Sequence, residues 1–140
     1  MRRFGLSMLA VAVALGVNLL AANEKPSDAM KAVMNGNTAA NAALREAAKA
    51  GNFDAVLAQV GAYKTSFAWI DAYFTHKKVD AAATIAKSGM KGAMDLEAAA
   101  VAKDQAAVDK GVAAVTGTCG ACHKQFRETL PDKTYEVKLP

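Results

Sequence analysis

The sequence contains only two cysteines, and both lie in the five-residue segment Cys119-Gly120-Ala121-Cys122-His123. On a helix, with about 100° of rotation per residue, Cys119, Cys122 and His123 share one stripe about 100° wide. Two thiols placed in this way can form thioether bonds to the two vinyl groups of one haem, while the adjacent imidazole reaches the iron from the same side. The pattern C-x-x-C-H is the signature of such covalent haem attachment.

Three other sites that use two cysteines fit the sequence less well. A thioredoxin-like redox pair lies at the start of a helix that follows a strand, whereas residues 105–118 predict a helix that continues into the motif. A zinc site needs about four ligands, and His76 is the one other histidine. A disulfide between Cys119 and Cys122 would close a very short loop and would constrain the chain little. Haem attachment is therefore the favoured interpretation.

The N-terminus is typical of a secretory signal peptide, because Met1-Arg2-Arg3 is followed by an apolar run over residues 4–22. Bacteria attach covalent haem outside the cytoplasm, so both ends of the sequence predict a periplasmic protein. Cleavage after Ala22 leaves one domain over residues 23–140. Leu20 occupies a position where a small side chain is preferred, so an uncleaved anchor that contacts the membrane stays open as the alternative. The apolar run is near the lower limit for a spanning helix.

The charge balance excludes some functions. The 140-residue chain has a formal net charge of +4 at pH 7, and removal of Arg2 and Arg3 with the signal would lower it by two. So small a charge predicts neither nucleic-acid binding nor strong electrostatic steering. The sequence shows no nucleophile–base pair and no phosphate-binding loop, so we expect no enzyme and no catalytic residue.

The region that must position the motif is predicted to be all-α. It is rich in alanine, no segment shows sustained strand alternation, and its prolines, Pro26, Pro131 and Pro140, lie outside the central stretch. Capping residues and helix stops predict four helices: from Ser27 to about Ala50 before Gly51; from Asn52 or Asp54 to the polar turn Thr75–Lys78; from Asp80 to about Ala102; and from Asp104 to about Thr129. Connections this short predict an antiparallel up-down-up-down bundle, followed by a loosely held tail over residues 132–140.

The signal peptide, the four helices and the segment C-G-A-C-H-K-Q-F-R together resemble the class II cytochromes c, the cytochrome c′ family. The likeness covers residues 23–140 in helix order, and residues 119–127 are its most specific part. The resemblance implies one haem c, held by two thioether bonds to Cys119 and Cys122, with His123 as the proximal iron ligand. It also implies that Arg127 lies beside that imidazole. An exposed arginine that stabilises a helix C-terminus is an equally good interpretation of Arg127.

The resemblance leaves the sixth iron position to be assigned. Cytochrome c′ proper leaves it vacant, whereas low-spin relatives fill it with a methionine from the first helix. Met30 and Met34 lie on one helix face, and we favour Met34, which lies in the family's methionine position relative to Gly51. Met30 lies in the first turn, where fraying would make a ligand hard to hold. Met90 and Met94, on the third helix, are expected to line the bundle interior or the haem edge, and core packing is the alternative for every methionine.

The remaining aromatic and imidazole side chains are assigned to structure. Phe67, Trp69, Tyr73 and Phe74 are expected to pack in the core, with haem contact by Trp69 or Tyr73 as the alternative. His76 is expected in an exposed turn. Gly89 and Gly92 are expected to let the porphyrin or a neighbouring helix come close.

The sequence therefore predicts a periplasmic electron carrier whose iron has His123 and Met34 as axial ligands. The alternative is a high-spin cytochrome c′ that binds NO or CO at a vacant distal site. The expected partners are periplasmic or membrane-bound redox proteins. Many relatives dimerise through their first two helices, so a homodimer stays open.

Overall fold

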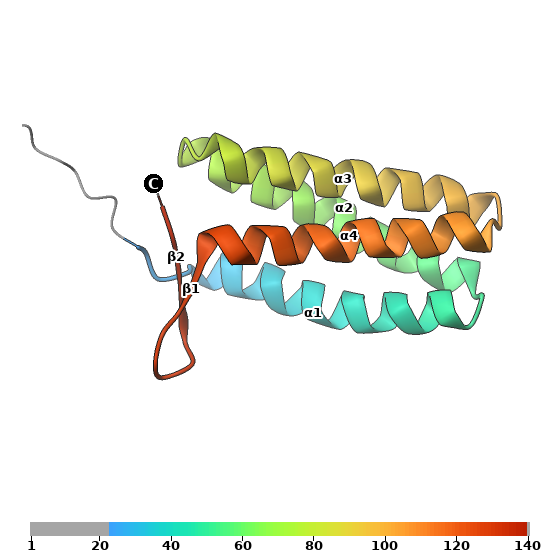
Figure 1. Ribbon diagram of the computed structural model, residues 1–140, viewed down its shortest axis with the longest axis horizontal. Coiled ribbons are helices and arrows are strands. Elements are labelled where there is room, and N and C mark those ends of the chain that lie inside the picture. The colour runs from blue at the N-terminus through green and yellow to red at the C-terminus, as the bar shows by residue number, and fades with distance from the viewer. Residues whose placement is uncertain (1–22, 140) are drawn as a thin grey trace, which may run out of the picture.

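The computed structural model describes residues 23–139, and the predicted signal peptide lies outside these residues. Four helices follow one another in an up-down-up-down arrangement (Figure 1), which confirms the predicted bundle. The elements are α1 (Asp28–Lys49), α2 (Phe53–His76), α3 (Asp80–Val101), α4 (Gln105–Phe126), β1 (Arg127–Thr129) and β2 (Tyr135–Val137). Among the described helices, none combines the length and the apolar character needed to span a bilayer.

Side-chain caps begin three of the helices as predicted. Ser27 accepts a hydrogen bond from the Met30 amide at 3.2 Å, Asn52 from the Ala55 amide at 3.0 Å, and Asp104 from the Ala107 amide at 3.0 Å. The predicted cap at Asp80 is wrong, because Val79 is the N-cap of α3 and makes no side-chain bond. Val79 is buried, so packing of its side chain fixes the start of α3. In the other three helices a polar cap has this role.

The three turns between the helices share one backbone conformation. Each has a residue in the left-handed region directly after the C-cap, namely Gly51 at φ 65°, Lys78 at φ 59° and Lys103 at φ 55°. In each turn the next amide bonds back to a carbonyl of the last helical turn, as Asn52 does to Ala47 at 2.9 Å. This is the Schellman arrangement, which glycine predicts at residue 51 but which nothing in the sequence indicates at the two lysines.

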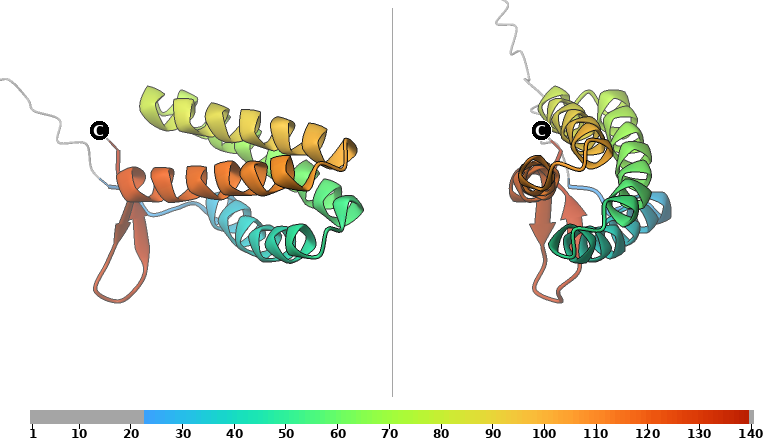
Figure 2. Two further views of the ribbon diagram at one scale, coloured as in Figure 1. Left: turned by 45° about the vertical axis from the view of Figure 1, so that its right-hand side comes forward. Right: turned by 90° about the vertical axis from the view of Figure 1, so that its right-hand side faces the viewer.

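Small residues on α3 set how closely the helices approach one another. Its buried face consists of Ala82, Ala83, Ala86, Gly89, Gly92, Ala93, Leu96, Ala99 and Ala100. α2 and α4 pack extensively on this face, whereas α1 and α4 pack least of the neighbouring helix pairs. Figure 2 shows α1 diverging from the rest of the bundle. The bundle is therefore tight around α3 and open between α1 and α4.

The C-terminal region differs from the prediction, because α4 ends at Phe126 and not near Thr129. Arg127 takes extended backbone angles, φ −117° and ψ 125°, and β1 pairs with β2 in an antiparallel hairpin. The predicted loose tail is wrong as well, since Val137 in β2 is only 6% exposed. Pro131 restricts only Leu130 and does not account for the earlier end of α4. The pairing of β1 with β2 does, because it satisfies the backbone groups that a longer helix would have used.

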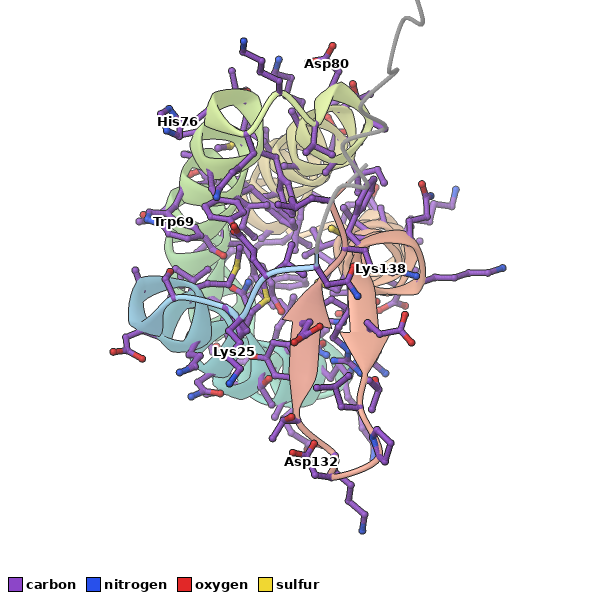
Figure 3. The ribbon with its side chains drawn as sticks, turned by 90° about the vertical axis from the view of Figure 1, so that its left-hand side faces the viewer. Lys25, Trp69, His76, Asp80, Asp132 and Lys138 are labelled. Atoms are coloured by element: carbon purple, nitrogen blue, oxygen red, sulfur yellow. The ribbon has the colours of Figure 1, made fainter. Side chains whose placement is uncertain are left out.

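The turn of the hairpin projects beyond the bundle, with Asp132 at its tip (Figure 3). The Asp132 carboxylate accepts the Thr134 amide at 2.9 Å and the Thr134 hydroxyl at 2.6 Å. These bonds hold the pKa of Asp132 below its usual range. The Asp132 side chain thus takes the place of a backbone acceptor and closes the turn.

The segment before α1 is tied to the hairpin and to α2 through Glu24. Its backbone makes two hydrogen bonds with Val137, at 3.0 and 2.8 Å. Its carboxylate accepts the Tyr73 hydroxyl and lies 2.6 Å from Lys77 Nζ. The bond from Lys77 and then that from Tyr73 hold the pKa of Glu24 below its usual value of 4.5. Both ends of the domain are therefore fixed to one end of α2.

We predict that Gly89→Ala destabilises the bundle. A Cβ at this position would lie 2.4 to 2.7 Å from three ring atoms of Phe67, which is wedged between α2 and α3. Overpacking of this kind costs about 1 to 3 kcal/mol, measured as the free energy of unfolding in urea. The matched control is Gly61→Ala on α2, where nothing lies within 4 Å of the added Cβ and the better helix former should gain up to about 1 kcal/mol. Equal effects of the two changes would contradict the close approach.

We also predict that Glu24→Gln lowers the free energy of unfolding at neutral pH but not in acid. A carboxyl whose pKa is lower in the folded state stabilises that state above its unfolded pKa, near 4.5, and loses this effect as the pH falls through the folded value. The variant and the wild type should therefore converge at acidic pH. Glu128→Gln is the control, because Glu128 makes only a 3.9 Å ion pair with Lys138. A difference between Glu24→Gln and wild type that is constant with pH would count against the charged network.

Candidate functional site

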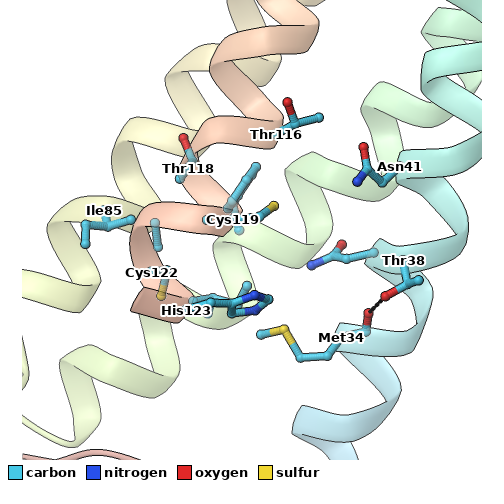
Figure 4. Close-up of a pocket in the computed structure, with 14 residues that line it drawn as sticks. Met34, Thr38, Asn41, Ile85, Thr116, Thr118, Cys119, Cys122 and His123 are labelled. Carbon is cyan, nitrogen blue, oxygen red and sulfur yellow. Dashed lines mark hydrogen bonds between the residues drawn. The ribbon is translucent and has the colours of Figure 1, made fainter. Parts of the chain in front are cut away.

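The last turns of α4 place Cys119, Cys122 and His123 on one wall of a cavity of about 290 Å³. The helical stripe expected from their spacing is therefore present, and it faces the open seam between α1 and α4. Figure 4 shows the Cys119 sulfur and the His123 ring extending from α4 toward α1, and Cys122 also lines the cavity. The structure thus brings together the three residues that the sequence predicts for haem attachment.

The opposite wall comes from α1, where Met34, Asn37, Thr38 and Asn41 line the cavity. Their spacing repeats at three and four residues, which places them on one helix face. Figure 4 shows the Met34 thioether reaching toward the His123 ring from across the cavity. The Thr38 hydroxyl donates to the Met34 carbonyl oxygen at 3.0 Å. Its proton is therefore used within the turn of α1 that carries the methionine.

Side chains from α2 and α3 form an apolar back wall, with Phe67, Ile70, Ile85 and Ala86 lining the cavity. Phe67 stacks on the buried Tyr63, with ring centroids 6.0 Å apart. The sequence indicated the aromatic group but not which member lines the cavity. The spacing from Met34 would have found Asn37, Thr38 and Asn41, whereas the back wall depends on how α2 and α3 rotate in the bundle.

The other aromatic and imidazole predictions have mixed outcomes. Phe67 and Phe74 are buried as expected, but Trp69 and Tyr73 are half-buried and stack on each other at 5.4 Å. Trp69 points away from the bundle in Figure 3, and neither ring lines the cavity. His76 is exposed as predicted, although it ends α2 and does not lie in a turn.

Burial sets the protonation of the residues at the site. It raises the pKa of the Cys119 thiol and raises that of Cys122 to about 11, with the neighbouring Cys119 as the second cause. It lowers the pKa of His123, and the charge of Arg127 lowers it further. At neutral pH the thiols are therefore protonated and the imidazole is neutral, the form that can bind a metal ion.

These properties disfavour the other uses of the two cysteines. Both thiols are free. A redox pair gains reactivity at the start of a helix, whereas Cys119 and Cys122 lie at the end of α4. Within residues 23–139, no group of three or more histidine, cysteine, aspartate or glutamate side chains is arranged to hold a metal ion. A zinc site of protein ligands alone is thus not formed in the described chain.

Arg127 lies in β1, one residue beyond α4, and still comes near the histidine. It lines a small second cavity, of about 40 Å³, together with His123 and Met30. Its guanidinium carbon lies 5.6 Å from the centroid of the Tyr135 ring. Arg127 is also the C-cap of α4 and is exposed, so the geometry agrees with both interpretations, the one beside the imidazole and the one at the helix C-terminus.

The two methionines of α1 differ in their surroundings. Met34 lines both cavities, whereas Met30 is 3% exposed and packs in the core. The expected fraying around Met30 is not supported, because the Ser27 cap holds its amide. On α3, Met90 packs against the core, but Met94 is 54% exposed, so the prediction that Met94 lines the interior is wrong. Gly89 admits Phe67 as expected, and Gly111 admits Leu96 in the same way.

The residues around the larger cavity fit haem c. Two thiols and a neutral imidazole come from one short helical segment, a thioether faces them from α1, and an apolar wall closes the back. Two cysteines and an adjacent histidine are the residues that covalent attachment and ligation of the iron from one side require. Cys119 and Cys122 would hold the group and His123 would bind its iron.

Comparison with known proteins gives one result that bears on this site. Residues 72–127 match the family model described as Cytochrome C', a range that begins in α2 and ends one residue after α4. No curated protein and no solved structure matches the chain significantly.

Proposed function

We propose that this chain, whose residues 72–127 match the Cytochrome C' family model, is a member of the cytochrome c′ family and an exported electron carrier with one covalently attached haem c. Proteins of this family are electron carriers or gas binders, not enzymes, and are typically periplasmic. The observation that carries the proposal is the cavity with His123 on one side and Met34 on the other.

Each residue has a distinct role in this proposal. Cys119 and Cys122 fix the group to α4 through thioether bonds, and His123 holds the iron from the same side. When bound, haem c supplies a one-electron redox couple, and histidine–methionine ligation raises its reduction potential. Met34 supplies the thioether from α1, and its turn is braced by the Thr38 hydroxyl. Phe67, Ile70 and Ile85 exclude water from the back of the site.

Export and partners follow from the same proposal. The residues that form the predicted signal peptide precede Asn23, and the folded domain already includes Glu24 through its bonds to Val137 and Tyr73. Cleavage after Ala22 is compatible with that boundary. We propose periplasmic or membrane-bound redox proteins as the partners.

Covalent attachment is tested by Cys119→Ala combined with Cys122→Ala. Without the thiols no thioether can form, so acidified organic solvent should remove the haem from this variant and leave it on the wild-type polypeptide. The measurement is the haem absorbance that stays with the protein after extraction. Haem that remains on the double variant would rule out attachment through these cysteines.

The ligand from α1 is tested by comparing Met34→Ala with Met30→Ala. If the Met34 thioether binds the iron, CO has to displace it, and Met34→Ala should bind CO to the ferrous protein much faster than wild type does. Met30→Ala should keep the wild-type rate and lose about 2 to 5 kcal/mol of stability, because it removes a buried side chain. Stopped-flow mixing with CO gives the rates. Fast binding in Met30→Ala alone would move the ligand one turn toward the N-terminus, and fast binding in wild type would favour the gas-binding alternative.

A further inference from the structure

The C-terminal hairpin forms a second wall of the site, on the side of the histidine. Antiparallel pairing places Arg127 opposite Val137 and Thr129 opposite Tyr135. Arg127 and Tyr135 are therefore diagonal neighbours on one face of the hairpin. Val137 on the same face is buried. Arg127, Tyr135 and Val137 all line the small cavity that also contains His123 and Met34, so this face of the hairpin is turned toward the site.

Tyr135 is the contact that holds the Arg127 side chain. The guanidinium carbon lies 5.6 Å from the ring centroid, within the range of a cation–π interaction. Among the ion pairs of residues 23–139, none involves Arg127. The ring of Tyr135 therefore contacts the guanidinium without forming an ion pair. Glu136, which also lines the small cavity, forms no ion pair with Arg127 either.

We propose that Tyr135 is a positioning residue that holds the Arg127 guanidinium beside His123 and so keeps a positive charge next to the iron's histidine ligand. This inference rests on the proposed function. The sequence motif includes Arg127 but not Tyr135, which lies in a region that the sequence assigns to a loose tail. The hairpin is what makes the two residues neighbours.

The charge has a defined effect on an electron carrier. A positive charge near the iron disfavours the ferric state, which carries one more positive charge than the ferrous state, and therefore raises the reduction potential. Arg127 is exposed, so its effect depends on how near the guanidinium stays to His123. Loss of the charge, or movement of the guanidinium away from His123 to where solvent screens it more, should lower that potential. The effect belongs to the position of the guanidinium, so it should be lost when Tyr135 no longer holds it.

The test uses holoprotein and compares Tyr135→Ile, Tyr135→Phe, Arg127→Gln and the Tyr135→Ile, Arg127→Gln double variant. Each is poised at the midpoint potential of wild type, and the ratio of oxidised to reduced protein is read by absorbance. Arg127→Gln should raise this ratio several-fold. Tyr135→Ile should raise it by a smaller factor, because isoleucine keeps the strand propensity but offers no ring face. Tyr135→Phe should match wild type, and the double variant should match Arg127→Gln.

Lys138→Gln is the charge-matched control. It removes a positive charge from the hairpin at a residue that lines neither cavity and pairs only with Glu128 at 3.9 Å, so the ratio should stay close to that of wild type. Melting curves by circular dichroism accompany each variant. If Tyr135→Ile acted by unfolding the hairpin, it would shift the potential in the Arg127→Gln background as well.

Distinct results separate the two levels of the proposal. Additive shifts in the double variant, an unchanged ratio in Tyr135→Ile, or an unchanged ratio in Arg127→Gln would overturn the role of Tyr135 while the haem remained attached. A wild-type protein without covalent haem would overturn the proposed function, and this inference with it.

Discussion

The loose packing between α1 and α4 is the constraint on which the site depends. Alanine and glycine on α3 bring α2 and α4 close to it, and Gly89 and Gly111 allow contacts that a Cβ would block. α1 stands apart from α4, and the cavity opens along that seam. Because Cys119, Cys122 and His123 share one helical stripe, a single rotation of α4 directs all three into the gap. Met34 lines the same cavity from α1.

The two ends of the domain complete this arrangement. Glu24 ties the segment before α1 to β2 and to α2, and the Lys138 amide bonds to the Phe126 carbonyl at 2.9 Å. The hairpin is thereby held against the end of the bundle where Met30, His123 and Arg127 meet. An end that a plain four-helix bundle leaves open is covered here, with a positive charge retained beside the histidine.

Local signals predicted most of the fold and the part of the site that lies on one helix. Ser27, Asn52 and Asp104 cap their helices as their residue types indicate, and the cysteine and histidine spacing fixes a stripe whatever the surroundings. The hairpin could not be predicted in this way, because three-residue strands have no visible alternation and depend on pairing between residues 127 and 137. The contact of Tyr135 with Arg127 and the exposure of Met94 also depend on tertiary packing, which sequence spacing does not specify.

The most direct test of the account is the spin state of the wild-type protein, read from absorption and electron paramagnetic resonance spectra. Ligation by His123 and Met34 would fill both axial positions of the iron, so we expect a low-spin haem in the ferric and the ferrous states. The cavity would then hold the iron between α4 and α1. A high-spin haem in both states would contradict the account, because the iron would have no ligand from α1.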